Sequence, residues 1–403
     1  MNIVHLNTHD WYGGASIVAY RLAQKQRVLK HDSKILCGYK VTNNSNCLTF
    51  PIERADDDEK TKQGWVYANL RGSKSLPYHH LIANADILNL HNLHGGYFNY
   101  EHLPRLVNSV PTIWTLHDMQ GLTGRCAHSF ACNRWESGCG QCPHPEYYPT
   151  SIADASAEMW HNKKEIYENS KINLVCPSKW LKKKIDGSLL AEKEVSLIYN
   201  GVDEKKYRPM PDVSLEMHGL ASTSILVGFL AHGGVKNPYK GGQYLLDAVQ
   251  SLSELFPEIS FLEIGGDPRD NELPENFIKA TYTKDENSIA KLYNSIDLLI
   301  YPSIADNCPL VVLEAMSCGT PIVAFPAGGI PELIEHNRTG FITEEISTTS
   351  LIRACSSLIK SKQLRKQFGQ ESRNRVLRSF TLDQQTEKYL NLYNQVSEDR
   401  KEC

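Results

Sequence analysis

Two kinds of segment are missing from this chain of 403 residues. No run of about 18 apolar residues occurs, which is the length that indicates a membrane-spanning helix. The first residues, Met1 to Leu6, lack the basic start and long apolar stretch of a secretory signal peptide. We therefore expect a cytoplasmic protein.

A strong charge of either sign is also missing. Lys and Arg number 43 and Asp and Glu number 46, so the formal net charge is -3. This balance gives no general attraction to nucleic acid, and any anion site must be local. The stretch from Trp180 to Asp186 contains three adjacent lysines on an expected helix. It is interpreted either as a solvated helix face or as a peripheral contact with an anionic membrane at its inner face.

A disulfide framework is not indicated by the eleven cysteines. Four of them lie in a long irregular stretch, 121–149, that has too few apolar residues to pack by itself. Three interpretations of these four are open: a structural Zn²⁺ site, with His128 and His144 as substitute ligands, reduced thiols, or disulfides. The four are Cys126, Cys132, Cys139 and Cys142.

Short apolar runs alternate with longer helical patterns, which is typical of parallel sheets with crossover helices. The pattern occurs twice, and from residue 347 onward only helix is expected. A helix is also expected over 242–255 and over 288–294. The expected strands are 3–7, 34–37, 86–91, 112–116, 174–177, 195–199, 225–230, 259–264, 277–282, 298–301 and 322–325.

A chain of this length exceeds one ordinary hydrophobic core, so two domains are expected. The predicted fold class is α/β, with two Rossmann-like domains whose parallel sheets face a central cleft, and with C-terminal helices. The predicted boundaries are 1–203, 204–380 and a C-terminal helix over 381–403 that packs back on the N-terminal domain. Because ligands of open α/β sheets sit beyond the carboxyl ends of the strands, residues just after each strand are candidate site residues.

In the N-terminal half, Gly13 and Gly14 follow the first strand and open a helix. They could let backbone N–H groups approach a phosphate, although the spacing is not that of the dinucleotide-binding fingerprint and a plain tight turn is an equal explanation. His117 and Asp118 end another strand. An imidazole there could bond a sugar hydroxyl or stabilise charge, with the carboxylate holding it or assisting; a structural histidine is the alternative.

In the C-terminal half, Lys240 precedes Gly241 and Gly242 at the start of a helix. Its charge could neutralise a diphosphate, although a solvated loop lysine explains this segment at least as well. The segment from Tyr301 to Pro321 is more informative. Asp306 lies in a loop before an expected helix start near Pro309, with Glu314 inside the helix. Helix N–H groups and these carboxylates suit an anion and sugar hydroxyls, and a structural cap or salt bridge is the alternative.

Taken together, these motifs resemble family 4 of the retaining glycosyltransferases, the GT-B type, and within it the bacterial exopolysaccharide and O-antigen enzymes. The resemblance covers nearly the whole chain. It is carried by the motifs above, in the family's order, together with Pro177-Ser178, residues 200–203 and residues 327–332.

The resemblance implies roles for particular residues. Two family glutamates seven residues apart contact the donor, one beside the transferred sugar and one on the ribose. Glu314 matches the second, whereas Asp306 stands at the first. The family's arginine before the lysine is missing here, so either Lys236 takes over part of its role or the phosphates of the donor rest more on backbone N–H groups. The implied site residues are His117, Asp118 and Asp306 for catalysis, and Gly13, Gly14, Lys236, Lys240, Asn307, Leu310, Val311 and Glu314 for donor binding.

The resemblance also implies retaining, metal-independent transfer from a UDP-, GDP- or dTDP-sugar to a glycan or lipid-linked saccharide in cell-surface polysaccharide synthesis. No cofactor is expected for catalysis, since helix N-termini and lysine replace the divalent ion and no Asp-x-Asp motif stands out. A GT-B epimerase or phosphorylase is one alternative. A non-catalytic protein that binds a sugar nucleotide is the other.

Overall fold

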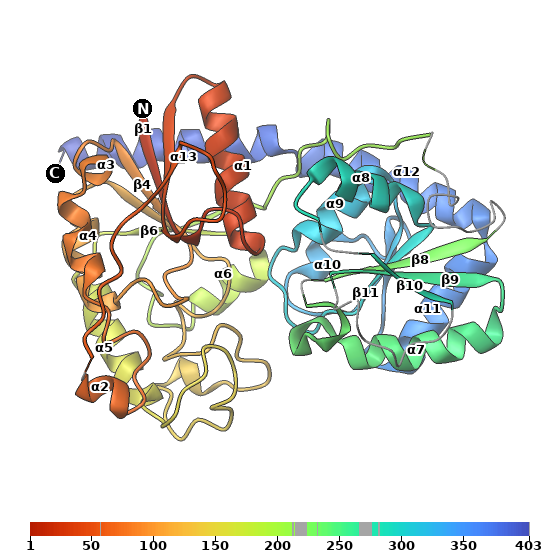
Figure 1. Ribbon diagram of the computed structural model, residues 1–403, viewed down its shortest axis with the longest axis horizontal. Coiled ribbons are helices and arrows are strands. Elements are labelled where there is room, and N and C mark those ends of the chain that lie inside the picture. The colour runs from red at the N-terminus through yellow and green to blue at the C-terminus, as the bar shows by residue number, and fades with distance from the viewer. Residues whose placement is uncertain are drawn as a thin grey trace. The chain divides into compact units, whose positions relative to one another are not determined.

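The computed structural model describes residues 1–56, 58–211, 213, 224–231, 233–265, 276–280 and 283–402. The chain forms two compact units (Figure 1). Unit 1 contains Met1–Tyr199 together with Gln385–Cys403, and unit 2 contains Asn200–Gln384. Each unit is an α/β layered structure with its own sheet and core.

The sheet of unit 1 has seven strands in the order β3-β2-β1-β4-β5-β6-β7, and every pair is parallel. Parallel pairing follows from the crossover segments between the strands, and it brings all carboxyl ends to one edge. The central strands β1, β4, β5 and β6 are largely buried, which agrees with their apolar runs, whereas the edge strands β3 and β7 are only partly buried. They are β1 (Asn2–His9), β2 (Asp32–Tyr39), β3 (Cys47–Thr49), β4 (Ile87–Leu90), β5 (Thr112–Thr115), β6 (Asn173–Cys176) and β7 (Val195–Leu197).

Helices of very different length surround this sheet. The longest of those before the second unit, α1, begins directly at the Gly13-Gly14 turn and buries Val18, Leu22 and Ala23 against the strands. The helices are α1 (Gly14–Val28), α2 (Glu59–Lys62), α3 (His80–Ala83), α4 (Leu103–Val107), α5 (Ser156–Glu168) and α6 (Lys179–Ile185).

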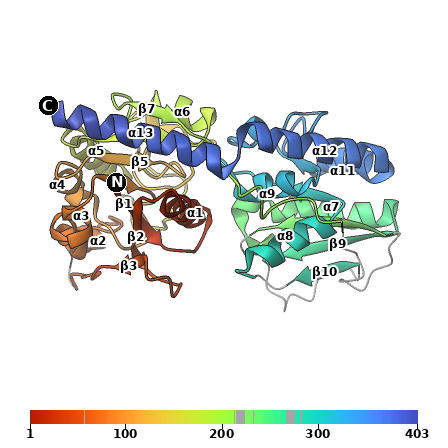
Figure 2. The same cartoon turned by 90° about the horizontal axis from the view of Figure 1, so that it is seen from above.

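The last helix, α13 (Leu382–Glu402), lies along the sheet of unit 1 (Figure 2). Its residues Tyr389 and Tyr393 are fully buried. The Tyr393 hydroxyl accepts a hydrogen bond from Asn89 Nδ2 at 2.8 Å, and the Tyr389 hydroxyl lies 3.1 Å from Thr115 Oγ1. These contacts fix the end of the chain on strands β4 and β5.

The sheet of unit 2 has six parallel strands in the order β10-β9-β8-β11-β12-β13. Its core combines these strands with the apolar faces of the helices α7 and α11. The strands are β8 (Ile225–Leu230), β9 (Ile259–Ile264), β10 (Phe277–Ala280), β11 (Leu298–Tyr301), β12 (Ile322–Ala324) and β13 (Gly340–Ile342). The helices are α7 (Gly242–Leu255), α8 (Glu286–Ser295), α9 (Leu310–Cys318), α10 (Ile330–Leu333), α11 (Thr348–Lys360) and α12 (Lys362–Ser379).

The structure confirms the predicted α/β class, and each predicted strand has a counterpart. Residues 281–282 of one predicted strand lie outside the described residues. Two strands were not predicted, β3 and β13, because three residues are too few to show a periodic pattern. Only helices follow residue 347, as predicted. In the part of the chain that the structure describes, no helix has both the length and the apolar character to cross a bilayer.

Candidate active site

The Gly13-Gly14 turn at the carboxyl end of β1 leaves open space in front of its backbone. Gly13 has φ 79° and ψ 163°, a conformation that side chains strongly disfavour. A Cβ atom added at either glycine would meet nothing within 4 Å. The first N–H groups of α1 have no acceptor within the helix, so this turn offers a place where an anion could approach the backbone.

His117 follows β5 and is the outermost of three hydrogen-bonded histidines. Its Nε2 lies 2.9 Å from Nδ1 of His91, which follows β4. His91 Nε2 lies 2.9 Å from Nδ1 of His5, which belongs to β1. His5 and His91 are fully buried, whereas His117 is partly exposed. The three rings therefore form a row across three neighbouring strands.

Burial keeps these imidazoles neutral. It lowers the pKa of His5 and of His117 to about 4, and the pKa of His91 well below its usual value. Charged neighbours act in both directions on His117, since Asp118 raises its pKa and His94 lowers it, but burial is the larger effect. At neutral pH, His117 is thus poised to act as an uncharged hydrogen-bonding group.

Asp118 is bonded to other groups than His117. Its Oδ2 lies 2.7 Å from Nε2 of His94, and its Oδ1 accepts the backbone N–H of Gln120 at 2.9 Å. Burial alone would raise the pKa of Asp118, but the charge and hydrogen bond of His94 bring it below the usual value. The carboxylate expected to hold the His117 ring accordingly holds His94, and His91 occupies the place beside His117 Nε2. No sequence pattern pointed to these partners, because His5 lies in β1 and both His91 and His94 follow β4, whereas the predicted site residue follows β5.

In unit 2, Lys240 and Asp306 form an ion pair. Lys240 Nζ lies 2.9 Å from Oδ1 and 2.7 Å from Oδ2 of Asp306. Tyr301 donates its hydroxyl to Oδ2 at 2.7 Å, and Ser303 donates at 2.5 Å. The side chains of Lys240 and Asp306 are 22% and 17% exposed, so a ligand can reach both. Lys240 is therefore paired and not simply solvated; this ion pair is the salt-bridge alternative for Asp306, and a role of the two residues in donor binding stays a prediction.

Helix α9 begins at Leu310, four positions after Asp306, with Pro309 as its N-cap. The first helical N–H groups, on Leu310 and Val311, have no acceptor within the helix and carry the positive end of its dipole. Asn307 is 8% exposed, and Val311 is partly exposed. The fold thus brings Lys240 to a short segment that carries a carboxylate and a helix N-terminus.

Glu314 lies in the second turn of α9 and is 6% exposed. Its Oε2 accepts the hydroxyl of the fully buried Tyr293 of α8 at 3.0 Å. A buried carboxylate needs such donors, because removing a charge from water is costly.

Lys236 is exposed on a short 3-10 turn, Gly234–Lys236, and this turn is held by a hydrogen bond to strand β9. Glu263 of β9 is 1% exposed and accepts the backbone N–H of Val235 at 2.8 Å. A lone glutamate in the apolar strand Ile259–Ile264 is the sequence signal that could have identified this anchor. Gly241 and Gly242 have a packing explanation, since a Cβ at either would lie under 2 Å from a backbone oxygen of Pro302 or Val235.

The four clustered cysteines all line one small cavity in unit 1, of about 30 Å³. Cys139 Sγ accepts the N–H of Gly124 at 3.3 Å, and Cys142 Sγ lies 3.6 Å from Arg125 Nη2. Within the residues that the structure describes, no three His, Cys, Asp or Glu side chains are arranged to hold a metal ion. The cavity therefore has the donor atoms of a zinc site, but the thiols would have to turn toward a shared centre to coordinate one.

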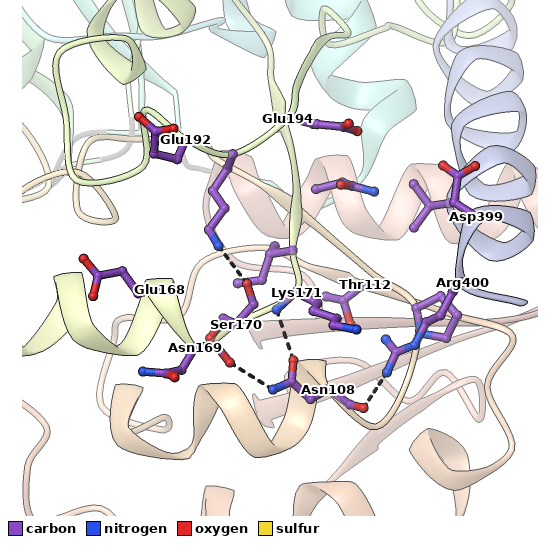
Figure 3. Close-up of a pocket in the computed structure, with 15 residues that line it drawn as sticks. Asn108, Thr112, Glu168, Asn169, Ser170, Lys171, Glu192, Glu194, Asp399 and Arg400 are labelled. Carbon is purple, nitrogen blue, oxygen red and sulfur yellow. Dashed lines mark hydrogen bonds between the residues drawn. The ribbon is translucent and has the colours of Figure 1, made fainter. Parts of the chain in front are cut away.

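A larger pocket of about 520 Å³ lies in unit 1 at the amino ends of the sheet strands, away from the edge that carries His117 (Figure 3). It includes Thr112 at the start of β5 and Asn173 at the start of β6, whereas His117 follows the other end of β5. Arg400 of α13 closes one side by bonding the carbonyl of Asn108. Acidic and basic side chains alternate around it, and none of the predicted site residues lines it.

Comparison with known proteins assigns a family to these features. Residues 226–361 match the sequence profile of the family described as "Glycosyl transferases group 1", a segment that contains the Lys240, Asp306 and Glu314 positions. The chain is 24% identical over 323 residues to the putative colanic acid biosynthesis glycosyl transferase WcaC of Escherichia coli K12, which covers 76% of each chain. These comparisons support a glycosyltransferase whose C-terminal half resembles group 1. The resemblance predicted from its motifs is thereby confirmed.

Other relatives of this glycosyltransferase match over shorter stretches. N-acetyl-alpha-D-glucosaminyl L-malate synthase of Bacillus anthracis is 28% identical over 220 residues, which is 52% of this chain and 56% of the relative. This glycosyltransferase thus spans little more than half of that relative. Among solved structures, sucrose-phosphate synthase of Thermosynechococcus elongatus superimposes with a TM-score of 0.71 at 15% identity, covering 98% of each chain. The glycosyltransferase has the GT-B fold.

Proposed function

We propose that this glycosyltransferase moves a sugar from a nucleotide-sugar donor to a glycan or lipid-linked saccharide acceptor in cell-surface polysaccharide synthesis, with retention of the anomeric configuration and without a metal ion. The observation that carries this proposal is the cationic group of unit 2. Lys240, paired with Asp306 just before the N-terminus of α9, supplies a positive charge and backbone donors for a diphosphate. The relative named for colanic acid biosynthesis aligns over three quarters of the chain.

The proposed roles follow from the chemistry of each group. Lys240, exposed Lys236 and the N–H groups of Leu310 and Val311 stabilise the diphosphate, which is also the leaving group. Glu314 accepts hydrogen bonds from the ribose hydroxyls. Neutral His117 bonds the transferring sugar, where positive charge develops in the transition state.

The diphosphate charge is the reason that many glycosyltransferases need a divalent ion. A lysine and a helix N-terminus supply the same stabilisation without one. Residues 56–58 are three consecutive aspartates and formally match an Asp-x-Asp spacing. However, Asp58 caps α2 through Thr61 and pairs with Arg71 at 2.7 Å, so its carboxylate has a structural role.

The experiment begins with a thermal-stability screen of UDP-, GDP- and dTDP-sugars. A ligand at 100 times its dissociation constant stabilises the folded state by about 2.7 kcal/mol. The donor that binds is then incubated with saccharide acceptors, with and without EDTA, and the product anomer is determined by NMR. An inverted product, or activity abolished by EDTA and restored by a divalent ion, would contradict the mechanism while leaving the transferase assignment intact.

Product analysis also separates the alternatives. A sugar joined to an acceptor supports transfer, whereas an altered free nucleotide sugar would indicate an epimerase and a sugar phosphate a phosphorylase. The family match favours transfer. One relative is named for colanic acid biosynthesis and another for an L-malate product, so the acceptor panel should contain both saccharides and small hydroxy acids.

Peripheral membrane contact is proposed through helix α6. Its Lys182 and Lys183 are exposed, while Lys184 lies over the rings of Trp135 and Trp180. Two exposed lysines near an anionic surface contribute about 1 kcal/mol each. Flotation with vesicles of anionic and of neutral lipid tests this, and equal recovery with both vesicle types would contradict it.

A further inference from the structure

The row of histidines in unit 1 continues inward to an amide. Gln26 of α1 is fully buried, and its Oε1 lies 2.9 Å from Nε2 of His5. The same oxygen accepts the hydroxyl of buried Ser33 at 2.8 Å. Helix α1 and strands β1, β4 and β5 therefore contribute one unbroken line of hydrogen bonds that runs from Gln26 to His117.

In the structure the Gln26 amide turns its Oε1 toward His5 and Ser33, and its Nε2 is buried without a hydrogen-bond partner among the described residues. With this orientation the oxygen can only accept hydrogen bonds, which sets the direction of the whole line, whereas the opposite orientation would reverse it and give Nδ1–H at His117. His5 must carry its proton on Nε2 to donate to Gln26, and a neutral ring then leaves Nδ1 as an acceptor. His91 therefore donates from Nε2 to His5, and its Nδ1 accepts. His117 in turn donates from Nε2 to His91 and keeps Nδ1 unprotonated.

We propose that Gln26 is a positioning residue for His117: through His5 and His91 its amide oxygen fixes the Nε2–H tautomer of His117, so that Nδ1 is the nitrogen that accepts a hydrogen bond from a hydroxyl of the transferring sugar. The second half of this statement rests on the proposed function. The first half concerns the protein alone and is independent of any substrate.

Three further observations support the tautomer assignment. The rings of His5 and His91, and those of His91 and His117, have centroids 5.2 Å apart at small interplanar angles of 27° and 18°, so none can turn independently. The main chain of His91 is held by Trp114, whose Nε1 donates to its carbonyl at 2.8 Å. Burial lowers the pKa of all three rings, which keeps each with a single ring proton at neutral pH. A ring with a single proton donates one hydrogen bond and accepts the other, so all hydrogen bonds in the row point the same way.

Substituting Gln26 tests the assignment. Gln26→Met keeps the size of the side chain but removes the accepting oxygen, so both tautomers become accessible. Gln26→Glu keeps an accepting oxygen and should preserve the line. Ser33→Ala is the matched control, because it removes the second hydrogen bond to the same oxygen without touching the histidines. Each protein is labelled with [15N]histidine at full length, and the ring 15N shifts give the tautomer, with each ring assigned from the signal lost in its own His→Gln variant.

We expect Nε2–H at all three rings in the wild type, in Gln26→Glu and in Ser33→Ala, and a mixed population at His117 in Gln26→Met. Turnover of Gln26→Met should fall about tenfold with the donor KM nearly unchanged, because the lost contact matters chiefly in the transition state. Nδ1–H at His117 in the wild type or in Gln26→Glu, or an unchanged tautomer in Gln26→Met, overturns the proposal. These spectra decide it even if Gln26→Met does not fold or if no sugar is transferred, so its failure and that of the proposed function are distinguishable.

Discussion

Lys240 carries the charge expected to meet a diphosphate, and in the structure that charge is matched by Asp306. A diphosphate must therefore compete with the carboxylate for the same ammonium group. Asp306 also accepts Tyr301 and Ser303, so it is held firmly beside Lys240. The aspartate has two effects on the proposed reaction, since it restrains Lys240 and contributes the negative charge expected beside the sugar.

Asp306→Asn should separate these two effects. Removing the carboxylate charge releases Lys240 for the diphosphate, so we expect tighter binding of the nucleoside diphosphate, by roughly three- to tenfold, together with lower turnover. Calorimetry and steady-state rates measure the two quantities. Asp247→Asn, on the exposed surface of α7, is the control for a simple change in net charge. Weaker diphosphate binding in Asp306→Asn would show that the ion pair does not compete.

Glu314→Gln should weaken donor binding without unfolding the protein. The amide can still accept the Tyr293 hydroxyl, but it forms weaker bonds to ribose hydroxyls, and a lost charge-assisted bond costs about 1.5–3 kcal/mol. Donor affinity is measured by calorimetry, and Glu254→Gln on the exposed side of α7 is the matched control. Affinity equal to that of the wild type would remove Glu314 from the site.

His117→Ala should lower turnover by about 10²-fold or more and leave nucleoside diphosphate affinity nearly unchanged, because the histidine is proposed to bond the sugar. His161→Gln, an exposed histidine of α5, controls for general effects. A purely structural histidine would behave differently, since stability would fall and diphosphate binding would fall with the folded fraction. Near-normal turnover of a well-folded variant would exclude both roles.

At the level of elements, the proposed donor site is formed by the start of a helix and by the loops that position it. Helix α9 begins after Pro309, and the loop before it is held by Asp306, whose backbone carbonyl accepts the N–H of Gly329 at 3.1 Å. Gly328 is required there, since its φ is 58° and a Cβ would lie 1.8 Å from the Asp306 carbonyl oxygen. Two loops thus fix the start of α9 through backbone contacts.

The second such element is the irregular loop 121–149, whose fold would depend on a metal ion if its four cysteines bind one. We propose that its four thiols bind one structural Zn²⁺ by turning toward the cavity that they line. Elemental analysis of protein purified without a His tag should then give about one zinc per chain, and Cys139→Ser with Cys142→Ser should lose it. Metal-free, fully active protein with titratable thiols would instead identify the cysteines as reduced and unligated.

At the level of the whole molecule, burial of neutral histidines links stability to pH. The pKa of fully buried His5 is about 4, whereas an exposed histidine in an unfolded chain titrates near 6.5. Between these two values the unfolded chain binds a proton that the folded chain does not. The unfolding free energy should therefore be unaffected above about pH 6.5 and should fall as the pH is lowered toward 4, by up to about 1.4 kcal/mol per pH unit for this group.

Urea unfolding at several pH values measures this effect for unit 1 separately, because all six tryptophans, at positions 11, 65, 114, 135, 160 and 180, lie in that unit. Tryptophan fluorescence therefore reports on its sheet. His5→Gln should show a shallower loss of stability between pH 6.5 and 4, while His161→Gln should match the wild type. Equal slopes in both variants would mean that His5 does not resist protonation in the folded state.

The sequence by itself determined the architecture and the family. Apolar runs separated by helical patterns dictate parallel sheets, because only crossover helices can cover both faces of such strands, and the spacing of Lys240, Asp306 and Glu314 within their turns carried the glycosyltransferase resemblance. Tertiary structure alone decided which groups these residues meet. His5 lies in β1, whereas His91 and His117 follow β4 and β5, which come much later in the chain, and the strand order β1-β4-β5 aligns the three rings. Hydrogen-bond partners depend on ångström-scale geometry between such elements, which no local pattern encodes.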